Sequence, residues 1–164
     1  MAARGGHVET MDLLMEYGSD IHQPNVKGRT ALIEAAASGH MEAVKRLVVS
    51  GAEINHADAR GITALTEAVY NHHATIVEYL LEQGADPNHI DVTGKGPVVY
   101  AANKGHADIL QLLLANGVDV ERRYAHDLTA LMWAAGSGHQ DAVENLLAAG
   151  RRLQTSKMTV AVRL

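Results

Sequence analysis

Apolar residues along this chain fall into short groups with helical spacing, and the groups return at a fixed interval. Val44, Leu47 and Val48 form one such group, and a matching group follows 33 residues later. The i, i+3, i+4 spacing predicts amphipathic helices with one apolar face each. A shorter helix is predicted before each of them, in segments such as TALIEAAASGH from Thr30, because Thr favours a helix start and Gly a helix end. The pattern therefore predicts pairs of helices repeated along the chain.

Histidine and glycine positions follow the same interval. Two series have members 33 residues apart: His7, His40, His73, His106 and His139, and Gly18, Gly51, Gly84, Gly117 and Gly150. Turn sequences such as Asp58-Ala59-Arg60-Gly61 precede the helix pairs, since Asp can bond its own following backbone and Gly accepts positive φ. One such unit cannot bury its apolar face alone, so we expect neighbouring units to stack.

The combined pattern resembles the ankyrin repeat. Its order is D-x-x-G-x-T-[A/P]-L-x-x-A-A-x-x-G-H, then V-x-x-L-L-x-x-G-A-D-x-N, and it covers residues 1 to about 150. The resemblance implies an all-α fold, an ankyrin-repeat solenoid of β-hairpin fingers and stacked antiparallel helix pairs. It also implies that partners bind on the concave side, at the finger tips and the inner-helix face.

The repeat grid divides the chain into five units and a tail. We expect a partial N-terminal repeat at 1–24, repeats at 25–57, 58–90 and 91–123, an incomplete repeat at 124–150, and a non-repeat tail at 151–164. His72 departs from the family pattern by replacing a helix-ending Gly. The first and last units should be exposed ends of the stack. Their apolar residues are Met11, Leu13, Leu14, Val143, Leu146 and Leu147.

The tail RRLQTSKMTVAVRL breaks the repeat directly after Gly150. Its codons, read from one base earlier, accommodate the start of another repeat, Asn-x-x-Asp-Asp-Arg-Gly-Arg-Thr-Ala. One hypothesis is therefore that the tail is a frame-shifted translation of a fifth finger; the alternative is an ordinary divergent terminus. In the first case we expect it to be disordered or loosely draped over Leu146 and Leu147.

Composition supports thin helical layers and an intracellular, cytoplasmic protein. Hydrophobic residues make up 47% and aromatic residues 4%, so the core must be filled by Ala, Leu, Val, Ile and Met. The absence of Cys excludes disulfides, thiolate metal sites and Cys nucleophiles. No apolar run is long enough for a signal peptide or a membrane span.

Residues that could carry chemistry are better explained by structure. The repeated histidines lie one whole unit apart, too far to share a metal ion, and are interpreted as helix-start residues that bond backbone. No catalytic or nucleotide-binding motif occurs. Glu34 and Glu67 are interpreted as structural, and Tyr100 and Trp133, in the same slot of later units, as partly buried. We therefore predict no enzyme activity, no cofactor and no metal site.

Charge placement points to a binding surface. Basic residues concentrate on the fingers and the inner-helix ends, whereas acidic residues concentrate on the outer helices, within a net charge of −5. This predicts a basic concave side that attracts an acidic partner, although chance asymmetry of a solvated surface is the competing interpretation. The predicted partner-binding residues are Lys27, Arg29, Arg60, Tyr70, Asn71, Lys95, Asn103, Lys104, Arg122, Arg123 and His126.

The leading functional hypothesis is a non-catalytic scaffold, acting as a monomer, that binds a protein partner on the concave face and no membrane. One alternative is a nucleic-acid-binding surface on the same basic face, which the net acidity disfavours. Another is that the chain is a fragment of a larger multidomain ankyrin protein whose other domains carry the activity.

Overall fold

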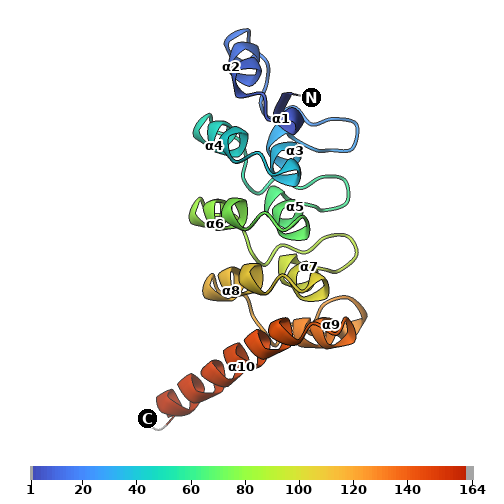
Figure 1. Ribbon diagram of the computed structural model, residues 1–164, viewed down its shortest axis with the longest axis vertical. Coiled ribbons are helices and arrows are strands. Elements are labelled where there is room, and N and C mark those ends of the chain that lie inside the picture. The colour runs from blue at the N-terminus through green and yellow to red at the C-terminus, as the bar shows by residue number, and fades with distance from the viewer. Residues whose placement is uncertain (1, 162–164) are drawn as a thin grey trace.

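The protein is a stack of short helix pairs, seen here in a computed structural model that describes the backbone of residues 2–161 and the side chains of residues 2–152 (Figure 1). The predicted all-helical stack is confirmed. The inner helices are α1 (Ala2–Gly5), α3 (Ala31–Ser38), α5 (Ala64–Tyr70), α7 (Pro97–Lys104) and α9 (Ala130–Gly136). The outer helices are α2 (Val8–Glu16), α4 (Met41–Val49), α6 (Ala74–Glu82), α8 (Ala107–Ala115) and α10 (Gln140–Ala161). A 3₁₀ turn, η1 (Ala125–Asp127), lies in the loop before α9.

The inner helices pack on one another from end to end of the stack, and each outer helix packs on its own inner helix. Alanines at the centre of this packing, such as Ala35, Ala68 and Ala101, have no exposed surface. Leucines such as Leu80 and Leu113 fill the space between inner and outer helices and are equally buried. Small residues where inner helices meet, and branched residues between inner and outer helices, allow the thin layers that the composition predicts.

Loops that connect the layers project to one side of the stack and form the fingers (Figure 1). Each finger is closed by a backbone hydrogen bond, such as Asp58 N–H to Ile62 O at 2.9 Å. Each is also tied to the next finger, for example by Ala59 N–H to Lys27 O at 3.1 Å. Gly28 is needed at this contact, because it has φ +77° and a Cβ there would lie 2.9 Å from Ala59 N.

Three of the repeated histidines tie their outer helices to the preceding layer. Nε2 of His40, His73 and His139 hydrogen-bonds to the carbonyl oxygens of Arg4, Ala37 and Asn103, at 3.0, 3.3 and 3.0 Å. The interpretation of these histidines as backbone-bonding residues is confirmed. The acceptor, however, lies in the preceding layer and not in the histidine's own helix, so the bond stabilises the stack.

The last outer helix is longer than the sequence predicts. Instead of breaking after Gly150, α10 continues to Ala161, so the expectation of a disordered or draped tail is wrong for residues 151–161. Gly51 and Gly84 end the earlier outer helices with positive φ, whereas Gly150 does not adopt positive φ. Arg-Arg-Leu-Gln after Gly150 favours continuation of a helix, in contrast to the turn residues that follow the earlier glycines. Residues 162–164 lie outside the described part of the chain.

Apolar side chains are exposed at both ends of the stack, but not all those that the sequence suggests. Leu14 and Leu147 are exposed, whereas Met11 and Leu146 are buried because they reach into the neighbouring layer. Over the part of the chain that the structure describes, none of the helices combines the length and the apolar character needed to cross a bilayer.

The residue directly before each repeated histidine occupies one slot of the repeat. His72 is the one member of this slot that is not glycine. Gly39 and Gly105 adopt φ near +75° in this slot, and His72 adopts φ +60°. A Cβ on Gly39 would meet the His73 ring at 2.6 Å, so a side chain in this slot collides with the histidine of the next layer. At His72 the collision is avoided by stacking on His106, with ring centroids 4.1 Å apart, and His106 Nε2 has no hydrogen-bond partner among the described residues.

We expect His72→Gly to raise the free energy of unfolding by about 1 kcal/mol, because it relieves the left-handed strain and lets His106 bond to the preceding layer. The ion pair lost with Asp108 is exposed and contributes only about 0–1 kcal/mol. Urea unfolding followed by circular dichroism measures the change. The reverse substitution Gly39→His is the matched control and should lower stability. A loss of stability in His72→Gly would contradict the account.

Candidate functional site

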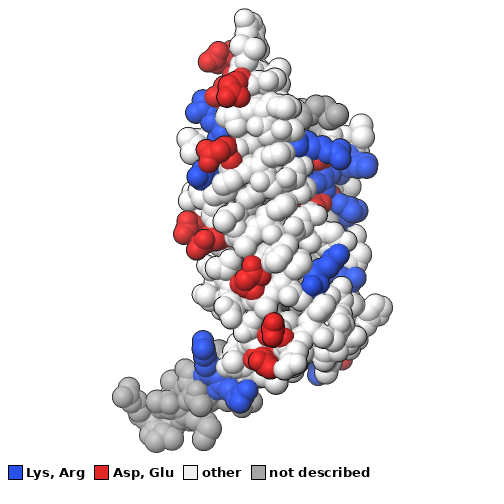
Figure 2. Space-filling model, in the orientation of Figure 1, with Lys and Arg blue, Asp and Glu red and all other residues white. Residues whose placement is uncertain are grey.

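The fingers and the adjoining ends of α3, α5, α7 and α9 form one continuous surface, called here the finger face. Figure 2 shows Lys and Arg gathered on this side and Asp and Glu mainly over the outer helices, with basic exceptions at α4 and near the end of the stack. The charge asymmetry expected from the sequence is therefore present on the folded surface.

Asp and Asn residues at the finger bends organise this face. Asp58 accepts hydrogen bonds from the backbone amides of Arg60 and Ile62, at 2.8 and 3.0 Å. Burial alone would raise the pKa of Asp58, but these amides and the Arg60 guanidinium hold it below its usual value. Asn25 forms the equivalent bend in the finger before, and Asp91 in the finger after. The bends therefore fix where the basic finger side chains begin.

The N-terminal part of the finger face is a cluster of paired charges. Arg29 binds Glu34 at 2.8 Å and Asp58 at 3.5 Å, and it also pairs with Glu67. Arg60 binds Asp58 and Glu67 at 3.2 and 3.6 Å. Burial opposes the charged form of Arg29, but its hydrogen bonds to the glutamates raise its pKa overall. Arg29 thus links two neighbouring layers, and because its side chain is only 10% exposed it presents little surface to a partner.

The C-terminal part of the finger face carries aromatic rings where the N-terminal part carries glutamates. Tyr100 occupies the slot of Glu67 and donates its hydroxyl to Asp91. Burial and this hydrogen bond raise the pKa of Tyr100 to about 12, so it stays protonated. Trp133 occupies the same slot in the last layer. Tyr70 lies edge-to-face against Tyr100, with centroids 5.8 Å apart.

Two lysines lie over these rings. Lys104 Nζ is 4.3 Å from the Tyr70 ring centroid, and Lys95 Nζ is 5.2 Å from the Trp133 ring centroid. Both separations allow cation–π attraction. The His126 ring is tilted relative to the Trp133 ring, with the two ring centroids 6.5 Å apart. Tyr70, Lys95 and His126 are thus close to Tyr100 or Trp133, which the sequence indicated only as partly buried, and Lys104 is close to Tyr70.

A hollow of about 360 Å³ opens on this face between two layers. It is lined by Arg60, Ile62, Thr66, Glu67, Tyr70 and Tyr100. Ile62, Tyr70 and Tyr100 supply apolar and aromatic surface, and Arg60, Thr66 and Glu67 supply polar surface of similar extent. An apolar side chain of a partner would fit such a hollow without disturbing the fold.

The remaining predicted residues lie around this centre. Asn71 bonds to Glu67 at the end of α5, and the side chain of Asn103 accepts a hydrogen bond from Ser137 at 2.9 Å. Arg122 and Arg123 belong to the loop before the last finger. Arg122 donates to Asn88 O at 3.3 Å and lies over the Tyr124 ring, while Arg123 pairs with Asp127. Lys27 is exposed and has no ion-pair partner among the described side chains.

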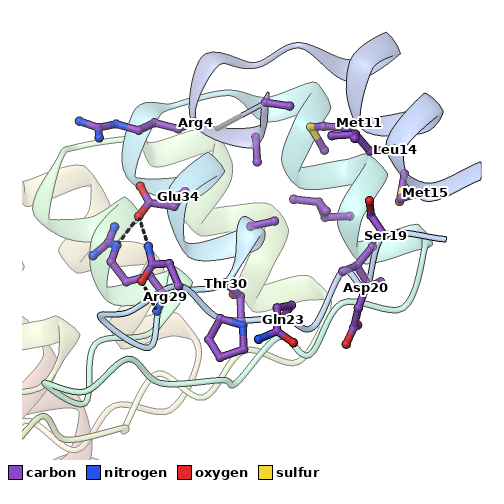
Figure 3. Close-up of a pocket in the computed structure, with 17 residues that line it drawn as sticks. Arg4, Met11, Leu14, Met15, Ser19, Asp20, Gln23, Arg29, Thr30 and Glu34 are labelled. Carbon is purple, nitrogen blue, oxygen red and sulfur yellow. Dashed lines mark hydrogen bonds and ion pairs between the residues drawn. The ribbon is translucent and has the colours of Figure 1, made fainter. Parts of the chain in front are cut away.

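A second hollow, of about 290 Å³, lies at the N-terminal end of the stack between the first two layers (Figure 3). Helix α1 has four residues where α3 has eight, so the first layer lacks the turn that carries Leu32 in the second. The hollow contains mostly apolar side chains such as Met11 and Leu14, and Glu34 lies at its edge with bonds to Arg29 and Asn25. Its shape follows from the short first layer.

Sequence reasoning missed two features of the finger face. It did not group Tyr100 and Trp133 with the lysines, although both share a repeat slot with Glu34 and Glu67 and so had to lie on the same row. The hollow lined by Tyr70 and Tyr100 was also not predicted, because no local sequence pattern marks a gap between layers.

Comparison with known proteins agrees with the geometry. A family model described as ankyrin repeats (3 copies) matches residues 1–91 and 88–157. No curated protein matches the chain.

We expect Arg29→Met to lower the free energy of unfolding by about 1–3 kcal/mol, because it leaves Asp58, whose side chain is 1% exposed, with fewer compensating charges. Lys27→Met, two residues away on the same finger, is the matched control and should change stability by less than about 0.5 kcal/mol. Urea titration of both variants tests the claim. Equal effects would show that the Arg29 cluster does not stabilise the stack.

Proposed function

The chain belongs to the ankyrin repeat family, and from that premise we propose that it is a non-catalytic module that binds a protein partner on its finger face. This face is the one that the family resemblance places on the concave side. A rigid scaffold with irregular side chains in repeated slots is well suited to recognition.

The observation that carries the proposal is the separation of charge across the stack. Basic side chains gather on the finger face and acidic side chains over the outer helices (Figure 2). Because the net charge of the whole chain is −5, the basic finger face is a local feature and not a consequence of overall composition. It would attract and orient an acidic surface of a partner protein.

We propose that partner contacts centre on the exposed and half-buried side chains of this face. They are Lys27, Arg60, Tyr70, Asn71, Lys95, Asn103, Lys104, Arg122, Arg123 and His126, with Arg29 beneath them as a support. Since the chain contains no Cys, none of its contacts depends on an oxidising compartment, and we propose a cytoplasmic scaffold role.

The proposal is tested by selecting binders from a displayed random peptide library and measuring their affinity for variants. The combined substitutions Arg60→Glu, Lys95→Glu and Lys104→Glu should weaken binding about tenfold or more and reduce its dependence on salt. The matched control is Glu78→Lys with Glu82→Lys, charge reversals on the outer helix α6, which should leave affinity unchanged.

Two results would contradict the proposal. Binders that are lost in the α6 control and retained in the finger-face variant would place the interface on the wrong side of the stack. A library that yields no binder to the folded protein would argue against a protein-binding module altogether.

A further inference from the structure

We propose that the C-terminal half of the finger face binds a partner segment that carries acidic side chains beside an apolar one. The acidic side chains would reach Lys95 and Lys104, and the apolar side chain would enter the hollow that Ile62, Tyr70 and Tyr100 help to line. This inference rests on the proposed protein-binding function and narrows it to one part of the face and one kind of ligand.

The distribution of paired charge points to this half of the face. Arg29 and Arg60 already contact Asp58 and Glu67, so an incoming carboxylate would compete with existing ion pairs. Among the described residues, neither Lys95 nor Lys104 has an acidic partner within ion-pair distance; each instead lies over an aromatic ring. A carboxylate would therefore not have to compete with an existing ion pair at either lysine.

The aromatic rings prepare the lysines for this contact. A lysine over a ring face gives up part of its conformational freedom before the partner arrives, which lowers the entropy lost on binding. Tyr100 is itself fixed by Asp91, and Tyr70 packs on Tyr100 with only 45% of its surface exposed. The site is thus already formed in the unbound protein.

The hollow supplies the apolar half of the recognition. Ile62, Tyr70 and Tyr100 contribute its apolar lining, and the charge of Glu67 at its rim is balanced by Arg29 and Arg60. An apolar side chain that covers these residues is partly removed from water, which favours binding. Charge at the lysines and an apolar anchor in the hollow together select an acidic segment with an apolar residue.

A single-stranded nucleic acid fits the same surface less well. Bases stack on open ring faces, but Lys104 and Lys95 already cover Tyr70 and Trp133. The observations therefore favour a protein segment, and an oligonucleotide serves as a competing ligand in the test.

Trp133 provides a direct readout, since it is the only tryptophan of the chain. The probe is a short synthetic peptide in which one leucine is flanked by glutamates, titrated at low salt while Trp133 emission is recorded. Two further peptides replace the glutamates by glutamine or the leucine by alanine, and oligo-dT is the fourth ligand. We expect saturable binding of the first peptide, at least about fivefold weaker binding of the other two, and weaker binding still of oligo-dT.

Variants locate the site. Lys95→Gln and Lys104→Gln should each weaken binding of the first peptide about twofold to fivefold, the range of one exposed ion pair. Lys45→Gln, on the outer helix α4 and outside the finger face, is the matched control and should leave binding unchanged.

The inference is overturned if the first peptide gives no saturable change, if oligo-dT binds more tightly, or if Lys45→Gln weakens binding as much as Lys95→Gln. The proposed function survives any of these results as long as library-selected binders still depend on the finger face. It fails separately if they do not.

Discussion

No helix pair of this chain can bury its own apolar face, so every layer depends on contact with the next. The contact is close because alanines such as Ala35 and Ala68 line the inner helices, and it is directional because His73 and its equivalents bond to carbonyl groups one layer earlier. Fingers follow the same rule, since each is tied to its neighbour by a backbone hydrogen bond. Stability therefore accumulates from interfaces between layers and is weakest at the two ends, where Leu14 and Leu147 remain exposed.

This stacking also arranges the functional surface. Because layers repeat, equivalent residues line up in rows across the finger face, and a row that does not contribute to stacking can change its chemistry from layer to layer. The row that begins with Glu34 and Glu67 continues with Tyr100 and Trp133. The two glutamates form ion pairs with Arg29, whereas the two aromatic residues lie near lysines, such as Lys95 over Trp133. One surface thus contains a supporting half and a half suited to recognition.

The exception at His72 shows how strictly the stack limits variation. A side chain in this slot occupies the space that the histidine of the next layer normally uses, so His106 stacks on His72. His106 Nε2 then makes no hydrogen bond of normal geometry, although the Tyr70 carbonyl in the preceding layer still acts to raise the pKa of His106. Burial and the nearby His72 outweigh this and lower the pKa of His106, which favours its neutral form. Variation is tolerated on the finger face because side chains there point to solvent, but a change between layers alters the neighbouring contact.

The sequence by itself determined the helix pairs, their order and the basic finger face, because these depend on local spacing and on a repeat that is visible in residues such as His40 and Gly51. It did not show that Arg29 would be enclosed by three carboxylates, that Lys95 would lie over Trp133, or that α10 would continue through Gly150. Only the tertiary structure decided these features. The first two depend on distances between side chains of different layers, and the third depends on which of two allowed backbone conformations Gly150 adopts. A linear sequence pattern shows neither the distances nor the backbone conformation.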